Sequence, residues 1–208
     1  MKKVFIAIPC MDEMPVDFVR SLVGLRSVGH VSVNFMAGAL VYASRDELMK
    51  RAVMEEADYI LWLDSDMVFK SDLLIDLMKH MDEGKDFVSG IYHKRKPPFN
   101  PVIYKTIRLG MTDDERVVEE YDDYPDEPFQ IDACGFGVVL HKIQIAKDML
   151  ENGGAFQPLP GYGEDISFCI RAKRLGYDMW ADPKIQAGHI AKTVSDRDTF
   201  EAWRRNNA

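Results

Sequence analysis

Apolar and polar positions along the first 92 residues predict strands separated by helices. Short, continuously apolar runs are typical of buried strands, and the stretches between them carry apolar side chains near helical spacing. This strand–helix alternation predicts a parallel, doubly wound sheet. The predicted strands are Val4–Pro9, Val31–Phe35, Tyr59–Leu63 and Phe87–Tyr92, and the predicted helices are Pro15–Val28, Ser44–Ala57 and Asp72–Met81.

Two helix boundaries carry specific signals. Ser44 with Glu47 three residues later matches a capping box, in which both side chains satisfy free N–H groups of the first turn. Gly84 follows Met81, and glycine is typical of the position just beyond a helix end. We therefore expect one helix to begin at Ser44 and another to end before Gly84.

The character of the chain changes after Tyr92. The segment 93–98 is basic and proline-rich, and residues 111–128 are strongly acidic, which favours a solvated hairpin or a mobile loop. Glycines inside an apolar strand, such as those of Gly135-Phe136-Gly137, mark a close approach of backbone or ligand. The remaining predicted elements are an edge strand over Pro101–Lys105, a strand over Ile131–Leu140, and helices over 142–152 and from Glu164 to Gly176.

Composition limits the class of protein. The chain has 208 residues, 47% of them hydrophobic and 29% charged, which is typical of a single globular domain over residues 1–208. It contains no apolar stretch of 18 residues and no signal-peptide pattern at its start, so we expect no membrane span. The three cysteines, Cys10, Cys134 and Cys169, lack metal-ligand spacing, so reduced thiols and a cytoplasmic location are expected. A net charge of -8 argues against a general affinity for nucleic acid.

Asp64-Ser65-Asp66 directly follows the apolar run Tyr59–Leu63. In regular strand geometry, positions 64 and 66 point the same way, at the carboxyl end of a buried strand. Two converging carboxylates repel each other unless a cation or proton lies between them, and Mg²⁺ or Mn²⁺ with phosphate oxygens suits such a site. The alternative is that both acids cap a helix that begins near Ser71.

Two further candidates lie late in the chain. Glu164 and Asp165 stand at the predicted start of a helix, where acids are favoured by the helix dipole. A carboxylate at that place could also accept the proton of an attacking hydroxyl as a general base. His189 lies between Gly188 and Ile190, and a lone histidine can be either a structural residue or a ligand.

These motifs together resemble those of a nucleotide-sugar glycosyltransferase of the GT-A fold, close to the family 2-like enzymes. Their order and spacing match the family over nearly the whole chain, and the Asp-Ser-Asp and Glu-Asp segments together are the most specific part. The segments that carry the resemblance are Ala7-Ile8-Pro9, Ser44-Arg45-Asp46, Trp62 to Met67, Ala133 to Gly137 and Gly163 to Cys169.

The resemblance implies a set of roles. Asp66 and His189 would bind Mn²⁺ or Mg²⁺, with Asp64 contacting the ribose or a metal-bound water. Asp165 would be the base and Glu164 would orient acceptor or donor, so that direct attack inverts the anomeric centre. The implied donor-binding residues are Pro9, Asp12, Arg45, Asp64, Ser65, Asp66 and Lys94, and the implied acceptor-binding residues are Gly135, Phe136, Gly163 and Glu164. Many relatives carry Asn where this chain has Asp46, which leaves recognition of the base and ribose open.

The expected partners follow from the same resemblance. The donor would be a nucleotide-diphosphate sugar, with uridine diphosphate favoured by family frequency, bound by residues 1–92; residues 93–208 would bind the acceptor. The acceptor hydroxyl could belong to a polysaccharide, a protein or a hydroxymethylated DNA base. The basic segment from His93 to Lys96 could hold the donor diphosphate or an anionic acceptor, or be a solvated loop, and Trp203, Arg204 and Arg205 could add contacts at the tail.

Two other functions fit parts of the pattern. A nucleotidyltransferase or pyrophosphorylase also holds a nucleotide-bound metal at a strand end, but it would normally show a glycine-rich phosphate loop after the first strand. The segment Ile8 to Glu13 has no such loop. A non-catalytic carbohydrate- or nucleotide-binding module of the same fold is the other alternative, and the joint presence of Asp64, Asp66, Asp165 and His189 speaks against it.

Overall fold

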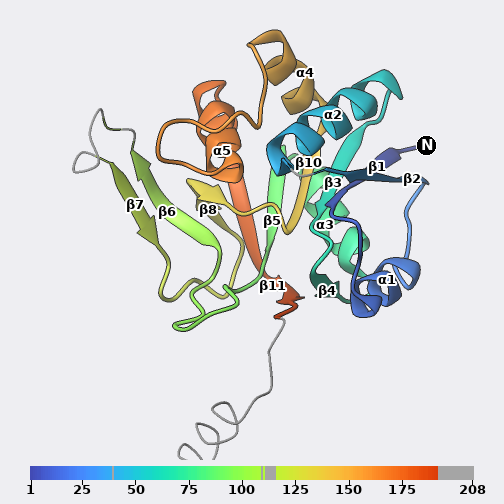
Figure 1. Cartoon of the computed structure of the whole chain (residues 1–208), viewed down its shortest axis with the longest axis horizontal. Coiled ribbons are helices and arrows are strands. Elements are labelled where there is room, and N and C mark those ends of the chain that lie inside the picture. The colour runs from blue at the N-terminus through green and yellow to red at the C-terminus, as the bar shows by residue number, and fades with distance from the viewer. Residues whose placement is uncertain (39, 109, 111–115, 192–208) are drawn as a thin grey trace, which may run out of the picture.

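The computed structural model describes residues 1–38, 40–108, 110 and 116–191 (Figure 1). The strands are β1 (Lys3–Cys10), β2 (His30–Ala37), β3 (Tyr59–Leu63), β4 (Met67–Phe69), β5 (Phe87–Ile91), β6 (Ile103–Arg108), β7 (Val117–Glu120), β8 (Phe129–Ile131), β9 (Ala133–Cys134), β10 (Val138–Lys142) and β11 (Met179–His189). The helices are α1 (Val16–Val23), α2 (Val41–Met54), α3 (Leu73–Asp82), α4 (Ile143–Glu151) and α5 (Glu164–Arg174).

The main sheet has the strand order β2-β1-β3-β10-β5-β11-β4. β1 is parallel to β2 and β3, and β5 is parallel to β11. β10 lies between β3 and β5 and is antiparallel to both, as β4 and β8 are to β11. The predicted α/β architecture, a mixed and mainly parallel sheet flanked by helices, is therefore confirmed. Because β10 lies between two strands of the first half, residues 1–92 and 93–208 share one sheet.

Helices cover both faces of this sheet and enclose two apolar cores (Figure 1). α2, α4 and α5 cover one face, where Trp62, Phe136, Phe156 and Phe168 pack edge to face or tilted against one another. α1 and α3 cover the other face with Phe18 and the leucines and methionines of α3. The alternating faces of β1 and β3 contribute to both cores, which explains their unbroken apolar sequence.

Some element boundaries differ from the sequence-based expectation. α2 begins at Val41 after Leu40, so Ser44 lies inside the first turn, buried, instead of capping the helix. The predicted strand over Ile131–Leu140 is divided among β8, β9 and β10, because the chain turns at Gly135-Phe136-Gly137. Propensity marks these residues as helical or extended, but only tertiary packing decides where the chain turns.

A second sheet, β7-β6-β9, lies beside α5 (Figure 1). The predicted edge strand over Pro101–Lys105 is instead β6, the central strand of this sheet, paired with β7 on one side and β9 on the other. Part of the acidic segment forms β7, while residues 111–115 and the Trp203–Arg205 tail lie outside the described residues. The predicted solvated hairpin is therefore correct for β7, whose side chains are largely exposed.

Two expectations from composition can be compared with the structure. Cys10, Cys134 and Cys169 are free thiols, as predicted. Within the part of the chain that the structure describes, no helix is both long and apolar enough to cross a membrane.

Strand direction brings the candidate residues to one edge of the sheet. β1 and β3 run in parallel and end at Cys10 and Leu63, next to the Asp-Ser-Asp segment. Val138, the first residue of antiparallel β10, pairs with Leu63, so the Gly135–Gly137 turn meets the same edge. β5 and β11 end there too, at Ile91 and His189. Ligands of such sheets bind beyond the carboxyl ends of the strands.

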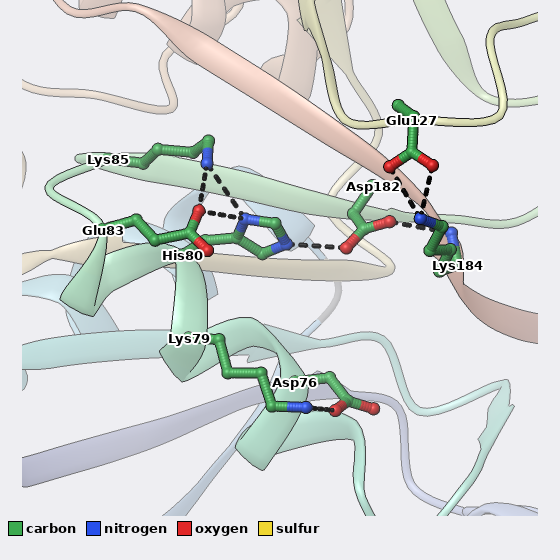
Figure 2. Close-up of polar contacts among 8 residues, drawn as sticks. All are labelled: Asp76, Lys79, His80, Glu83, Lys85, Glu127, Asp182 and Lys184. Atoms are coloured by element: carbon green, nitrogen blue, oxygen red, sulfur yellow. Dashed lines mark hydrogen bonds and ion pairs between the residues drawn. The ribbon is translucent and has the colours of Figure 1, made fainter.

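A polar clamp joins α3 to a bulge in β11 (Figure 2). His80 Nε2–H donates to Asp182 Oδ2 at 2.6 Å, while Lys85 Nζ donates to His80 Nδ1 at 3.1 Å. Asp182 Oδ1 also accepts the backbone N–H of Lys184 at 2.8 Å, where the register of β11 against β5 shifts. Bulges redirect the strand beyond them, and here that strand continues to His189.

We predict that Asp182→Ala lowers the free energy of unfolding by about 2–4 kcal/mol, because removal of one partner leaves the buried His80 without its acceptor. Urea unfolding followed by circular dichroism would measure the loss. The matched control is Lys79→Ala, which removes an exposed ion pair with Asp76 on the same helix and should change stability little (Figure 2). If Asp182→Ala lowers the free energy of unfolding no more than Lys79→Ala does, the clamp stabilises the fold no more than an exposed ion pair.

Candidate active site

The Asp64-Ser65-Asp66 segment is a turn between β3 and β4, held by backbone hydrogen bonds on both sides. The N–H of Asp64 donates to Gly137 O at 3.2 Å, and the N–H of Ile190 donates to Asp66 O at 2.8 Å. Strand alternation therefore does not apply beyond Leu63, so it does not establish that the two carboxylates point the same way. Asp64 and Asp66 each contact a different arginine.

Arg45 is a buried cation between the two acidic motifs. Its side chain is only 3% exposed; Nη2 donates to Asp64 Oδ1 at 2.7 Å, and Nε lies 3.6 Å from Glu164 Oε1. Burial works against the charge, but Asp64, Glu164 and Asp165 outweigh it and raise the pKa of Arg45 above its usual value. Nε and Nη1 are buried without a hydrogen-bond partner among the described residues, so the guanidinium keeps donors to spare.

Three aromatic rings lie against this guanidinium. Its Cζ lies 5.7, 5.4 and 5.7 Å from the ring centroids of Trp62, Phe136 and Phe156, within the range of cation–π attraction. Trp62 is fixed in turn, because its Nε1–H donates to His141 Nε2 at 2.9 Å. Burial lowers the pKa of His141 to about 4, so the imidazole is neutral and can accept that bond. Arg45 therefore sits in a rigid frame.

Asp165 lies at the start of α5, beside Glu164. Burial raises its pKa to about 6, and the neighbouring charge of Glu164 adds to the shift, while the Ile166 N–H and Arg45 oppose it. Asp165 Oδ1 accepts that N–H at 2.7 Å, which fixes the carboxylate. A carboxylate with a pKa near 6 is mostly ionised at pH 7 and basic enough to accept a proton in a reaction.

Asp66 and His189 face each other at 3.4 Å, measured from Oδ2 to Nε2. His189 Nδ1–H donates to His93 O at 2.9 Å, so the lone pair of the neutral ring lies on Nε2, as in metal-binding histidines. Burial works to raise the pKa of Asp66, but His189 and Arg95 outweigh it and hold that pKa below its usual range.

These two side chains fit a divalent cation. Adjacent ligands of an octahedral ion lie about 3 Å apart at metal–oxygen distances of 2.0–2.1 Å, close to the separation found here. Among the described residues no group of three or more His, Cys, Asp or Glu side chains could hold a metal. Asp66 and His189 could therefore supply two ligands, with the remaining positions open to phosphate oxygens and water.

Tyr92 fills the space beside the glycine turn. A Cβ at Gly135 would lie 2.0 Å from the Tyr92 hydroxyl, and one at Gly137 would lie 2.8 Å from its ring. The Gly137 N–H donates to that hydroxyl at 3.3 Å, and the ring meets His189 edge to face at 5.4 Å. Burial, together with the charges of Asp64 and Asp165, raises the pKa of Tyr92, so it stays a neutral phenol. The glycines are thus explained by the close approach of Tyr92.

Other predicted site residues take different positions. Phe136 is 1% exposed and packs in the core, so its side chain is excluded as an acceptor contact. Lys94 is paired with Glu120, whereas Arg95 reaches Asp66. Asp46 accepts the Phe156 N–H at 3.0 Å and so holds a chain segment. Of the remaining residues, Pro9 is buried at the end of β1, Asp12 and Gly163 are exposed, and Ser65 is half-buried in the turn.

Sequence reasoning missed Tyr92 as a residue of the site and named Arg95 only as part of the basic segment from His93 to Lys96. Both follow β5, whose carboxyl end reaches the same edge as that of β3. Their place at the end of a predicted strand, or shortly after it, was the available signal. It does not show which of the four successive side chains His93 to Lys96 turns towards Asp66.

Comparisons with known proteins agree with this geometry. The family model described as "Glycosyl transferase family 2" matches residues 41–137, which include Arg45, the Asp-Ser-Asp turn and the glycine turn. The chain is 25% identical over 186 residues to "Mannan polymerase complex subunit MNN9" of Candida albicans, a match that covers 73% of this chain and 49% of that protein. The chain thus spans about half the length of this curated relative.

Among solved structures, "A197 from STIV" matches with a TM-score of 0.60 and 19% identity, over 92% of this chain and 87% of that one. At this identity the likeness shows the fold alone. The family match, the curated relative and the mixed sheet together confirm the resemblance found in the sequence, which is to family 2-like glycosyltransferases of the GT-A fold.

Proposed function

We propose that this domain transfers a sugar from a nucleotide-diphosphate donor to an acceptor hydroxyl with inversion, and that Asp165 is the general base. The observation that carries the proposal is the position of Asp165: the Ile166 N–H fixes its carboxylate at the start of α5, beside Glu164 and the Arg45 bridge, where burial raises its pKa to about 6. Asp165 would take the proton from the acceptor hydroxyl as it attacks the anomeric carbon. Glu164, held by Arg45, would orient a substrate hydroxyl.

Asp66 and His189 would hold Mn²⁺ or Mg²⁺ in this proposal. Such a cation would neutralise charge that builds on the departing diphosphate. Asp64 is already neutralised by Arg45, so its remaining oxygen is better suited to a ribose hydroxyl or a metal-bound water than to direct ligation. Pro9 and Asp12, at the end of β1, would contact the nucleotide.

A carbohydrate hydroxyl is the acceptor class that the proposal favours. The name of the Candida albicans relative refers to a mannan polymerase complex, which favours a carbohydrate hydroxyl. A hydroxymethylated DNA base is less favoured, because Lys94 and Arg95 face carboxylates of their own chain instead of an open basic surface. Uridine diphosphate stays the first nucleotide to test, with guanosine diphosphate beside it. A cytoplasmic location also stays a prediction.

We predict that Mn²⁺ and a suitable nucleotide-sugar together stabilise the wild-type chain. A ligand at a hundred times its dissociation constant adds about 2.7 kcal/mol, which a thermal-shift panel of uridine and guanosine donors would detect, with chelator as the reference. Asp66→Ala should abolish the metal-dependent shift, since it removes a ligand. Asp76→Ala, a carboxylate on α3 paired with Lys79, is the matched control and should keep the shift. The metal-dependent proposal is wrong if chelator leaves the wild-type shift unchanged.

We predict that Asp165→Asn lowers turnover by ~10² or more while donor affinity stays within about tenfold, as expected for loss of a general base. In the wild type, turnover should fall as pH drops through about 6, where Asp165 becomes protonated. A pH–rate profile of donor turnover, recorded for the wild type and for Asp165→Asn, measures the loss of turnover and its dependence on pH. Turnover that is independent of pH between 5 and 8 would contradict the role of Asp165.

Asp165→Asn should also change stability in a pH-dependent way. The folded-state pKa of about 6 exceeds the ordinary aspartate value of 3.8, so the free energy of unfolding of the wild type falls as pH rises from about 4 to 6. Asparagine avoids this cost, so the variant should be more stable by about 1–3 kcal/mol at pH 7 and nearly equal at pH 4. Urea unfolding at both pH values would measure the difference. A variant that is less stable at pH 7 would show that Asp165 is not held against its charge.

A further inference from the structure

Two basic side chains lie next to the same oxygen of Asp66. Oδ2 lies 3.4 Å from His189 Nε2 and 3.2 Å from Arg95 Nη1. The guanidinium therefore lies next to the position between Asp66 and His189 that a divalent cation would occupy. A cation bound to Oδ2 and Nε2 would repel a guanidinium at this distance.

Arg95 differs from Arg45 in its freedom to move. The side chain of Arg95 is 53% exposed, whereas that of Arg45 is 3% exposed and enclosed by aromatic rings. Arg95 also lies on a loop whose base is closed where the Lys94 N–H donates to Asn100 O at 3.0 Å and His93 bridges Pro101. The guanidinium can thus leave Asp66 by rotation of its own side chain, without a change in the fold.

The chemistry of the proposed donor supplies a second partner for Arg95. Phosphate oxygens bound near Asp66 and His189 would bring negative charge next to the loop. A guanidinium can bind phosphate through two parallel N–H···O bonds, whereas its contact with the half-buried Asp66 joins Nη1 to Oδ2. Lys94 is unsuited to this task, because it is paired with Glu120. The side chain of Asn100 donates a hydrogen bond to the same carboxylate and helps to hold it in place.

We propose that Arg95 exchanges partners during donor binding: it lies on Asp66 before the metal and donor bind, and it then moves onto the diphosphate. This inference rests on the proposed function. Arg95 thus competes with the metal for Asp66 and cooperates with the metal in binding the donor. Because the metal displaces Arg95 and the diphosphate then binds it, metal and donor each favour binding of the other.

The proposal requires that one substitution of Arg95 raises the affinity for Mn²⁺ and lowers the affinity for the nucleoside diphosphate. Arg95→Ala should bind Mn²⁺ alone roughly two- to fivefold more tightly, since the competing partly exposed ion pair is gone. With Mn²⁺ saturating, the same variant should bind the nucleoside diphosphate about tenfold more weakly, since a charge-assisted phosphate contact is lost. A residue that only supports the fold would weaken both or change neither.

Two variants serve as controls. Lys50→Ala removes an exposed positive charge on α2, outside the basic segment, so both affinities should stay within about twofold. Arg95→Lys keeps the charge but not the paired N–H geometry. It should therefore retain most of the competition with Mn²⁺ while recovering only part of the affinity for the diphosphate.

The experiment is a Mn²⁺ titration followed by electron paramagnetic resonance of the free ion, and calorimetric titration of uridine and guanosine diphosphates at saturating Mn²⁺. Opposite shifts in Arg95→Ala, with Lys50→Ala unchanged, support partner exchange. If the wild type binds both ligands but Arg95→Ala changes Mn²⁺ affinity by less than about twofold, or lowers it, the inference fails and the proposed function stands. If the wild type binds neither diphosphate with Mn²⁺, the proposed function and this inference fail together.

Discussion

The arrangement of the whole site depends on one buried guanidinium. Arg45 links Asp64 after β3 to Glu164 at the start of α5, so it joins parts of the chain about 100 residues apart. Without a cation here, the carboxylates of Asp64, Glu164 and Asp165 would face one another across a poorly solvated space. The rings of Trp62, Phe136 and Phe156 confine the guanidinium, and the aromatic core of the domain is therefore also the support of its acidic site.

The two aspartates of the turn have different environments, and this difference assigns them different tasks. Asp64 is held by a rigid and buried arginine, which leaves it little freedom to change partners. Asp66 contacts a half-exposed arginine and a histidine whose other nitrogen is fixed by a backbone carbonyl. The partner of Asp64 is fixed, whereas a partner of Asp66 can be exchanged. This combination suits a site that must bind a charged ligand and release it.

Much of the fold follows from local pattern. Continuous apolar runs predicted β1, β3 and β5 to within a residue or two, because strands buried on both faces need an unbroken apolar sequence. The prediction was wrong where packing overrides pattern. Nothing local shows that Ile131–Leu140 is divided among three strands, or that β6 is central to a second sheet, since both depend on partners far away in sequence. The resemblance placed Arg45 at the donor, and the structure adds that its guanidinium lies buried between the acidic motifs, which no local pattern shows.

The sequence by itself determined the α/β class, the residue types of the site and the resemblance to family 2, because these are properties of composition, period and motif order. Only the tertiary structure decided which arginine pairs with which aspartate, and that Tyr92 occupies the space left by Gly135 and Gly137. It also raised the pKa of Asp165 to about 6, since that shift comes from burial and from charges brought together by folding. Pattern along a chain specifies which groups are available, but distances and desolvation arise only when remote segments meet.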